Sequence, residues 1–336
     1  MSLRVASLDL PSFRPRFPWW GGDLQTLASR FVRPRTDLAP HSSERRSFAL
    51  PDGTGDTLLA MLDTPHQPRP SRPLAILIHG LTGAEASTYI LSAARALLDR
   101  GHRVLRLNLR GAGPSRATCG GQYYAGRSQD FRLLLSLLPR ELVAGGMIAV
   151  GYSLGGAMLL KYLGEEGEAT PLEAAASVCA PIDLSLVCQR MTQPRNRLYH
   201  AFILSQMKVE ATGEGAVISA QERAAILGSK SIWEYDDVFI GPRHGFAGAE
   251  DYYERCRPTR FMPAIRIPTL LVASGDDPWI PSTLYRTYDW AANPALLPLL
   301  PDGGGHVGFH GAGGCRTWSD LAVTRFFERT VSHTAP

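Results

Sequence analysis

From residue 74 onward, short apolar runs alternate with longer segments in which apolar residues recur at helical spacing. Short apolar runs bounded by glycine or proline are typical of strands that are buried on both faces. Strands that alternate with helices predict right-handed crossovers and a mainly parallel sheet, so the fold class is α/β with helices on both faces. The predicted strands are 74–78, 103–107, 147–150, 174–179, 269–274 and 296–300, and the predicted helices are about 87–100, 127–138 and 319–329.

Three segments depart from this alternation. Residues 1–43 are rich in proline, arginine and aromatic side chains, and we expect them to wrap over the domain. Residues 44–63 contain two strand-like runs around the turn signal Pro51-Asp52-Gly53, which predicts an antiparallel hairpin at the sheet edge. Residues 182–266 contain helical pieces, and we predict a helical lid over the strand ends, with a packing appendage as the alternative. The α/β core then consists of 44–181 and 267–336.

Composition narrows the class of protein. The chain has 336 residues, 44% of them hydrophobic and 20% charged, which is typical of a soluble globular protein. The net charge of +4 is spread along the chain without a basic run, so we expect no nucleic-acid partner. We find no apolar stretch near the roughly 20 residues of a membrane span and no secretion signal, and we expect a cytoplasmic protein. The scattered cysteines predict reduced thiols and no zinc site; they are Cys119, Cys179, Cys188, Cys256 and Cys315.

The first candidate chemistry lies where the run Met147–Val150 ends. The sequence Gly151-Tyr152-Ser153-Leu154-Gly155 follows this strand and precedes a helix-like segment. A G-x-S-x-G turn between a strand and a helix holds its serine in a strained conformation and exposes the hydroxyl group. Side chains at either glycine would collide with the neighbouring strand and helix. We therefore interpret Ser153 as a nucleophile.

A serine hydroxyl needs a base to accept its proton and an acid to orient that base. With this kind of turn, the acid and then the histidine follow the serine along the chain. We choose Asp277, which directly follows a strand, with Asp276 and Asp183 as alternatives. We choose His306 as the base because it lies in a glycine-rich loop after the last strand, and His310 is its nearest rival.

The same site needs backbone donors for the oxyanion of the tetrahedral intermediate. We predict the N–H groups of Leu154, just after the nucleophile, and of Leu81, in the loop His79-Gly80-Leu81-Thr82-Gly83. We expect His79 to fix this loop by hydrogen bonding. The aromatic side chains of the insertion predict an apolar acyl or alcohol pocket. The expected substrate contacts are Tyr152, Trp233, Phe246 and Trp279.

Together these motifs resemble the α/β-hydrolase superfamily and, within it, the YheT-like predicted hydrolases and carboxylesterases. The matching stretches span most of the chain: 79–83, 108–111, 151–155, 245–246 with 251–253, 276–278 and 304–309. The resemblance implies an α/β-hydrolase fold, a triad of Ser153, Asp277 and His306, and esterase activity on short acyl esters. One departure is Asp23, within Gly22-Asp23-Leu24-Gln25-Thr26, where relatives carry histidine.

We therefore predict a serine hydrolase that cleaves carboxylic esters through an acyl-enzyme intermediate and needs neither a cofactor nor a metal. Its partner would be a small-molecule ester, with an apolar acyl chain as one possibility for the pocket. The same machinery serves thioester, lactone or amide hydrolysis, and a non-catalytic ligand receptor is the alternative from another class. The acyl length, the physiological ester and the oligomeric state do not follow from the sequence.

Overall fold

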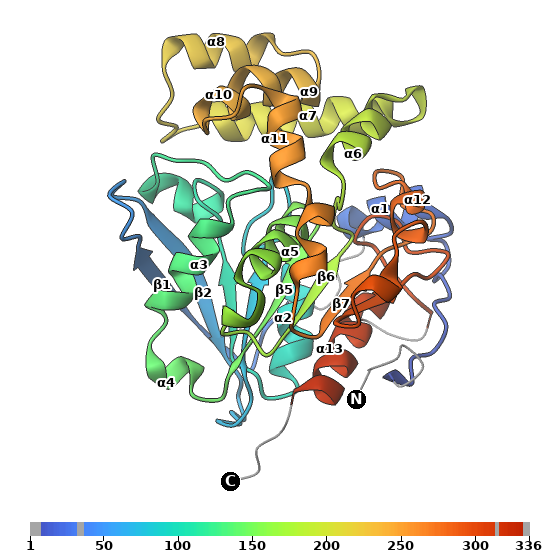
Figure 1. The fold of residues 1–336 in the computed structure, drawn as a ribbon. Helices are drawn as coiled ribbons and strands as arrows, with labels where there is room; N and C mark the ends of the chain where they lie inside the picture. The colour runs from blue at the N-terminus through green and yellow to red at the C-terminus, as the bar shows by residue number, and fades with distance from the viewer. Residues whose placement is uncertain (1–7, 32–36, 313–315, 332–336) are drawn as a thin grey trace.

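A computed structural model describes residues 8–31, 37–312 and 316–331. Its centre is one eight-stranded sheet in the order β1-β2-β4-β3-β5-β6-β7-β8, covered by helices on both faces (Figure 1). The pairs from β4 to β8 are all parallel, which confirms the predicted mainly parallel sheet. The strands are β1 (Ser42–Ala49), β2 (Thr57–Thr64), β3 (Leu74–Ile78), β4 (Val104–Leu107), β5 (Met147–Tyr152), β6 (Ala174–Val178), β7 (Thr269–Val272) and β8 (Leu296–Leu299).

The predicted hairpin forms the edge of this sheet. Strands β1 and β2 pair in antiparallel register from Ser42 opposite Thr64 to Ala49 opposite Thr57. Strand β2 also runs antiparallel to β4, so the hairpin extends the parallel sheet by two strands. The hairpin prediction is therefore confirmed.

The central strands are buried along their whole length because helices cover both faces. Helices α3 and α5 supply apolar side chains such as Phe131 and Leu159 to one face. Helices α2 and α13 supply Ile90 and Phe326 to the other. The helices outside the β6–β7 connection are α1 (Gly22–Phe31), α2 (Thr88–Leu98), α3 (Ser128–Leu137), α4 (Arg140–Val143), α5 (Leu154–Glu166), α12 (Ser282–Arg286) and α13 (Trp318–Thr330).

Six further helices lie between β6 and β7 and sit above the strand ends at the top of Figure 1. We call the segment that they span, residues 184–256, the cap. They share an apolar cluster of their own, built around side chains such as Phe239 and Tyr252, against which Leu81 and Leu154 of the core also pack. The cap helices are α6 (Leu184–Thr192), α7 (Arg197–Thr212), α8 (Ala220–Gly228), α9 (Ile232–Tyr235), α10 (Gly241–Arg243) and α11 (Ala249–Cys256).

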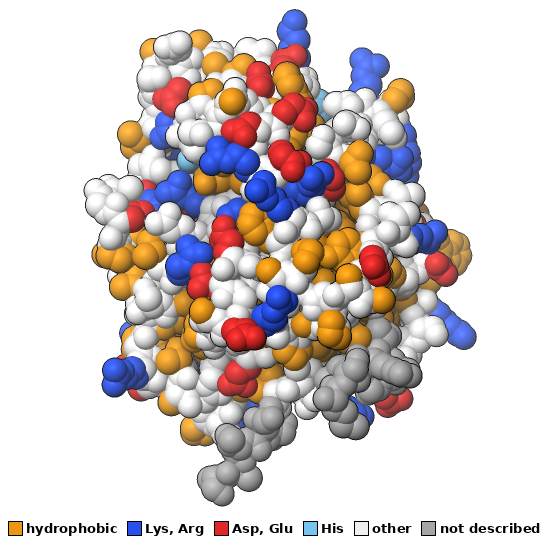
Figure 2. Space-filling view, in the orientation of Figure 1, with side chains coloured by type: hydrophobic (Ala, Val, Ile, Leu, Met, Phe, Trp, Pro, Cys, Tyr) orange, Lys and Arg blue, Asp and Glu red, His pale blue; other side chains and the backbone are white. Residues whose placement is uncertain are grey.

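The surface carries charges of both signs. Figure 2 shows acidic and basic side chains interspersed, with Lys and Arg side chains crossing the level where the cap meets the core. On α11, Arg255 pairs with Asp251 at 3.1 Å. No helix in the described part of the chain is long and apolar enough to cross a membrane. The four cysteines among the described residues are free and buried, and Cys315 lies outside the described residues.

Candidate active site

The turn between β5 and α5 carries Ser153. Its backbone has φ 50° and ψ −122°, a conformation that a non-glycine residue adopts only under strain. A Cβ atom at Gly151 would lie 2.5 Å from the carbonyl oxygen of Gly155, and one at Gly155 would lie 2.3 Å from the carbonyl oxygen of His79. Both contacts are far closer than real Cβ atoms allow. The predicted steric requirement for glycine at both positions is confirmed.

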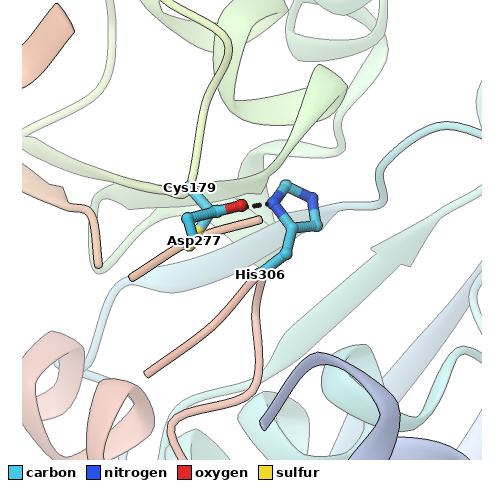
Figure 3. Close-up of side chains that lie close together, drawn as sticks. All are labelled: Cys179, Asp277 and His306. Carbon is cyan, nitrogen blue, oxygen red and sulfur yellow. Dashed lines mark hydrogen bonds and ion pairs between the residues drawn. The ribbon is translucent and has the colours of Figure 1, made fainter. Parts of the chain in front are cut away.

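Three side chains from different loops meet above this turn. The hydroxyl oxygen of Ser153 lies 3.0 Å from Nε2 of His306, and Nδ1 of His306 lies 2.8 Å from Oδ2 of Asp277. Figure 3 shows the imidazole and carboxylate side by side. With the proton on Nδ1, the imidazole donates to Asp277 and accepts from Ser153. The structure thus brings the three predicted residues into one hydrogen-bonded chain.

Backbone N–H groups hold the carboxylate of Asp277 in place. Its Oδ1 accepts hydrogen bonds from the backbone N–H groups of Trp279 at 2.8 Å and Ile280 at 3.0 Å. The indole of Trp279 packs on the imidazole of His306, with ring centroids 4.2 Å apart. Asp277 and His306 are both buried, and these contacts restrict the geometry of the pair.

The alternative candidates for acid and base make other contacts. Asp276 accepts hydrogen bonds from Ser274 Oγ at 2.5 Å and from the Gly305 N–H at 2.9 Å, and so supports the loop that carries His306. Asp183 caps α6 by accepting from the Leu186 N–H at 3.0 Å. His310 is buried beside α1, and burial lowers its pKa to about 4.

The N-terminal helix α1 also supports the histidine loop, and the sequence did not reveal this. The hydroxyl of Thr26 accepts a hydrogen bond from the His306 N–H at 2.8 Å. The Gln25 side chain accepts from the His310 N–H at 2.7 Å and donates to its carbonyl oxygen at 3.1 Å. The loop approaches so closely that a Cβ at Gly305 would lie 2.4 Å from the Gly22 carbonyl oxygen. The available signal was the family match of 22–26.

Asp23, the departure from the family pattern, faces the cap. Its carboxylate pairs with Arg195 at 2.8 Å and accepts a hydrogen bond from the Tyr199 hydroxyl at 3.1 Å. Tyr199 belongs to α7 and packs edge-on against Trp279. Asp23 therefore links α1 to the cap instead of joining the three-residue chain.

The loop after β3 lies against Ser153. A Cβ at Gly80 would come within 3.0 Å of the Ser153 Cβ, so the backbone of this loop lies directly against the serine. His79 is buried; its Nδ1 donates to the Gly80 carbonyl at 2.8 Å, and its Nε2 accepts from the Leu109 N–H at 3.0 Å. The predicted role of His79 in fixing the loop is confirmed. Leu154 is the first residue of α5, where backbone N–H groups lack partners within the helix.

Comparison with known proteins identifies the family to which the chain belongs. Residues 73–312 match the family model described as the alpha/beta hydrolase fold. The chain belongs to the α/β-hydrolase family. Within this family it belongs with the YheT-like proteins, because it is 31% identical to "Putative esterase YheT" of Escherichia coli K12 over 86% of this chain and 84% of that relative.

One further relative of the hydrolase and one solved structure are informative. It is 30% identical to "Medium-chain fatty acid ethyl ester synthase/esterase 2" of Saccharomyces cerevisiae over 76% of this chain and 62% of that relative. Among solved structures, the Pyrococcus furiosus esterase Pf2001 matches with a TM-score of 0.59 and 14% identity over 96% of this chain and 99% of that one. This second similarity shows the fold.

A cavity of about 380 Å³ opens between the cap and the core of the hydrolase. Ser153 and His306 lie in its wall together with Leu81, Leu154 and Trp279. Most of the remaining wall is apolar and comes from the cap. Representative lining residues of the cap are Val187, Met191, Phe202, Ile203, Met207 and Ile240.

Of the four expected substrate contacts, Trp279 lines the cavity and the other three lie elsewhere. Tyr152 is buried against Tyr89, with ring centroids 5.0 Å apart, because alternate strand residues face opposite sides of the sheet. Trp233 is partly exposed and donates its indole N–H to Glu250 at 2.9 Å. Phe246 fills the apolar cluster of the cap. Tyr152, Trp233 and Phe246 are therefore not part of the substrate contacts that we propose.

One group of described residues has the composition of a metal site. Ligand atoms of Cys179, Asp277 and His306 lie within 4.8 Å of one another (Figure 3). Burial and the charge of Asp277 raise the pKa of the Cys179 thiol well above its usual value. The sulfur atom instead accepts a hydrogen bond from the Val307 N–H at 3.4 Å. The cysteine thus packs behind the Asp277–His306 pair.

Proposed function

We propose that this chain is a serine esterase that hydrolyses carboxylic esters with an apolar acyl chain. The observation that carries the proposal is the hydrogen-bonded chain from Ser153 through His306 to Asp277, whose Ser153 end lies in the wall of a largely apolar cavity. A cavity of about 380 Å³ falls in the range of small-molecule sites, about 300–1,000 Å³. The names of the bacterial and yeast relatives support the same class of reaction.

In the proposed mechanism, Ser153 Oγ attacks the ester carbonyl carbon while His306 Nε2 accepts the hydroxyl proton. Asp277 holds the imidazole in the tautomer with the proton on Nδ1 and stabilises the imidazolium that forms. The C–O bond to the alcohol then breaks, and His306 delivers the proton to the leaving oxygen. A water molecule, activated by the same histidine, cleaves the acyl-enzyme and regenerates the serine.

We propose the N–H groups of Leu154 and Leu81 as the oxyanion donors. One well-placed donor is worth about 2.7–4 kcal/mol of transition-state stabilisation. The position of Leu154 at the start of α5 supports this role because the helix N-terminus favours negative charge. The contact of Gly80 with Ser153 supports the participation of the adjacent Leu81 peptide.

The wall of the cavity favours an acyl chain of medium length as the substrate group. Apolar cap side chains cover the space above Ser153, and each buried methylene contributes about 0.8 kcal/mol. The yeast relative's name specifies medium-chain fatty acid esters, which agrees with this choice.

Hydrolysis of a p-nitrophenyl ester series, from acetate to long acyl chains, tests the proposal on the wild type and on Ser153→Ala. We expect turnover with an optimum at intermediate chain length, and its loss in the variant. Covalent labelling by a fluorophosphonate separates the alternatives. Labelling of Ser153 without ester turnover would point to thioester, lactone or amide substrates. The absence of both labelling and turnover would favour a ligand receptor.

A further inference from the structure

A second chain of hydrogen bonds connects the cap to the loop that carries the proposed oxyanion donor Leu81. The backbone N–H of Thr82 donates to the hydroxyl oxygen of Tyr123 at 2.7 Å. The same hydroxyl donates to Oε2 of Glu210 at 2.8 Å. Thr82 lies next to Leu81, whereas Glu210 lies on cap helix α7. One tyrosine therefore joins the two parts of the protein that enclose the cavity.

The loop needs such support because its backbone is strained. Thr82 has φ 54°, a left-handed conformation that is unfavourable for a residue with a Cβ branch. His79 fixes the start of the loop through its bonds to Gly80 and Leu109. Tyr123 fixes the next turn, and its ring packs edge-on against His79, with centroids 5.9 Å apart. The peptide of Leu81 lies between these two supports.

The contact is largely buried and is reinforced from the core. Tyr123 is buried, and Glu210 is half-buried and lines the cavity beside it. Burial raises the pKa of Glu210 to about 7. Arg116, from the core segment η2 (Gly113–Thr118), donates to the backbone carbonyl of Glu210 and holds this turn of α7 in place. A hydrogen bond removed from such a site leaves a buried polar group without a partner, at a cost of about 1–3 kcal/mol.

We propose that Tyr123 and Glu210 are positioning residues, through which the seated cap holds the 79–83 loop with the Leu81 N–H directed at the oxyanion. This inference rests on the proposed esterase function and extends it. Closure of the cap and completion of the oxyanion hole are then one event. When α7 moves away, Tyr123 loses its acceptor and the strained Thr82 peptide loses its restraint.

The test compares two tyrosines in the same cavity. Tyr253 donates to Asp236 at 2.6 Å, so Tyr253→Phe removes a matched tyrosine–carboxylate bond that has no contact with the loop. The three measurements are kcat and KM on p-nitrophenyl butyrate, the rate of fluorophosphonate labelling, and amide hydrogen exchange in peptides that cover 79–83. Glu210→Gln keeps an acceptor for Tyr123, whereas Glu210→Leu does not.

We expect Tyr123→Phe and Glu210→Leu to lower kcat about 10-fold, because the donor is loosened and not removed; a lost donor costs about 10²–10³ in kcat. KM should change about 3-fold or less, labelling should slow in parallel, and exchange in 79–83 should accelerate. Glu210→Gln should recover most of kcat, and Tyr253→Phe should leave exchange in 79–83 unchanged.

Two results would overturn the inference while esterase activity stands. One is a kcat for Tyr123→Phe that falls no further than that of Tyr253→Phe. The other is a fall in kcat without faster exchange in 79–83, which would mean that the tyrosine does not act through the loop. A wild type that neither turns over esters nor labels would instead overturn the proposed function, and the positioning role of Tyr123 and Glu210 with it.

Discussion

The buried carboxyl group of Asp236 should make the stability of this hydrolase depend on pH. Asp236 begins the π-helical turn η5 (Asp236–Ile240), lines the cavity and accepts a hydrogen bond from Tyr253. Burial raises its pKa from 3.8 to about 7, and the bond from Tyr253 offsets only part of this effect. Below about pH 7 the folded protein therefore holds a neutral carboxyl group, whereas the unfolded chain ionises near 3.8.

The sign and size of the effect follow from these two values. Between them the unfolded chain binds fewer protons than the folded protein, so the free energy of unfolding falls as the pH rises. The difference between 3.8 and about 7, at about 1.4 kcal/mol per pH unit, gives about 4 kcal/mol. This stability is fully present below about pH 4 and is lost as the pH rises through about 7. Asp236→Asn keeps a neutral group of the same shape and avoids the loss.

Urea unfolding followed by tryptophan fluorescence would measure the free energy of unfolding at pH 4.5, 6 and 8. We expect the free energy of unfolding of Asp236→Asn, relative to that of the wild type, to rise by about 3 kcal/mol between pH 4.5 and 8. Asp302→Asn, at a fully exposed side chain, is the matched control and should follow the wild type throughout. A difference between Asp236→Asn and the wild type that stays constant with pH would refute the reasoning, because the folded protein would then tolerate the ionised carboxylate at no cost.

Three further predictions concern the serine turn, the proposed acid and the support of the histidine loop. Asp277→Asn should lower kcat on p-nitrophenyl esters by roughly 10⁴, because it stabilises the wrong histidine tautomer, and Asp276→Asn should lower it far less; equal losses would contradict the assigned roles. Gln25→Ala should lower kcat about 10-fold and the free energy of unfolding by about 1–3 kcal/mol, since it breaks both bonds to the histidine loop; unchanged kinetics would exclude a supporting role for α1. Gly155→Ala should abolish fluorophosphonate labelling and lower the melting temperature, whereas Gly228→Ala, where the added Cβ meets open space, should change neither.

The parallel sheet could be predicted because its strands are buried on both faces, which leaves continuous apolar runs in the sequence. The strand boundaries agree within two residues for runs such as Leu74–Ile78 and Leu296–Leu299. The turn at Ser153 was recognisable for a similar reason: its steric constraints act between residues that are close in sequence, so glycine is required at fixed positions.

Contacts between distant segments could not be predicted in this way. Helix α1 acts through Gln25 and Thr26, polar residues whose partners lie about 280 positions away. Nothing local distinguishes them from solvated side chains. Glu210 on α7 has the same property, since an acid on a helix is ordinarily exposed. Trp233 and Phe246 lie outside the cavity wall, because an aromatic residue in an insertion is equally suited to packing within the insertion.

The bond between Thr26 and His306 has a consequence for how the protein is made. It joins positions 280 residues apart, so the segment around Thr26 must wait for His306, which is synthesised 280 residues later. Domains begin to fold while the chain is still emerging from the ribosome. The serine turn and the cap can form in that period, but the histidine loop cannot yet be docked. We expect a nascent chain to carry an ordered Ser153 and remain inert toward esters until the segments around Thr26 and His306 meet.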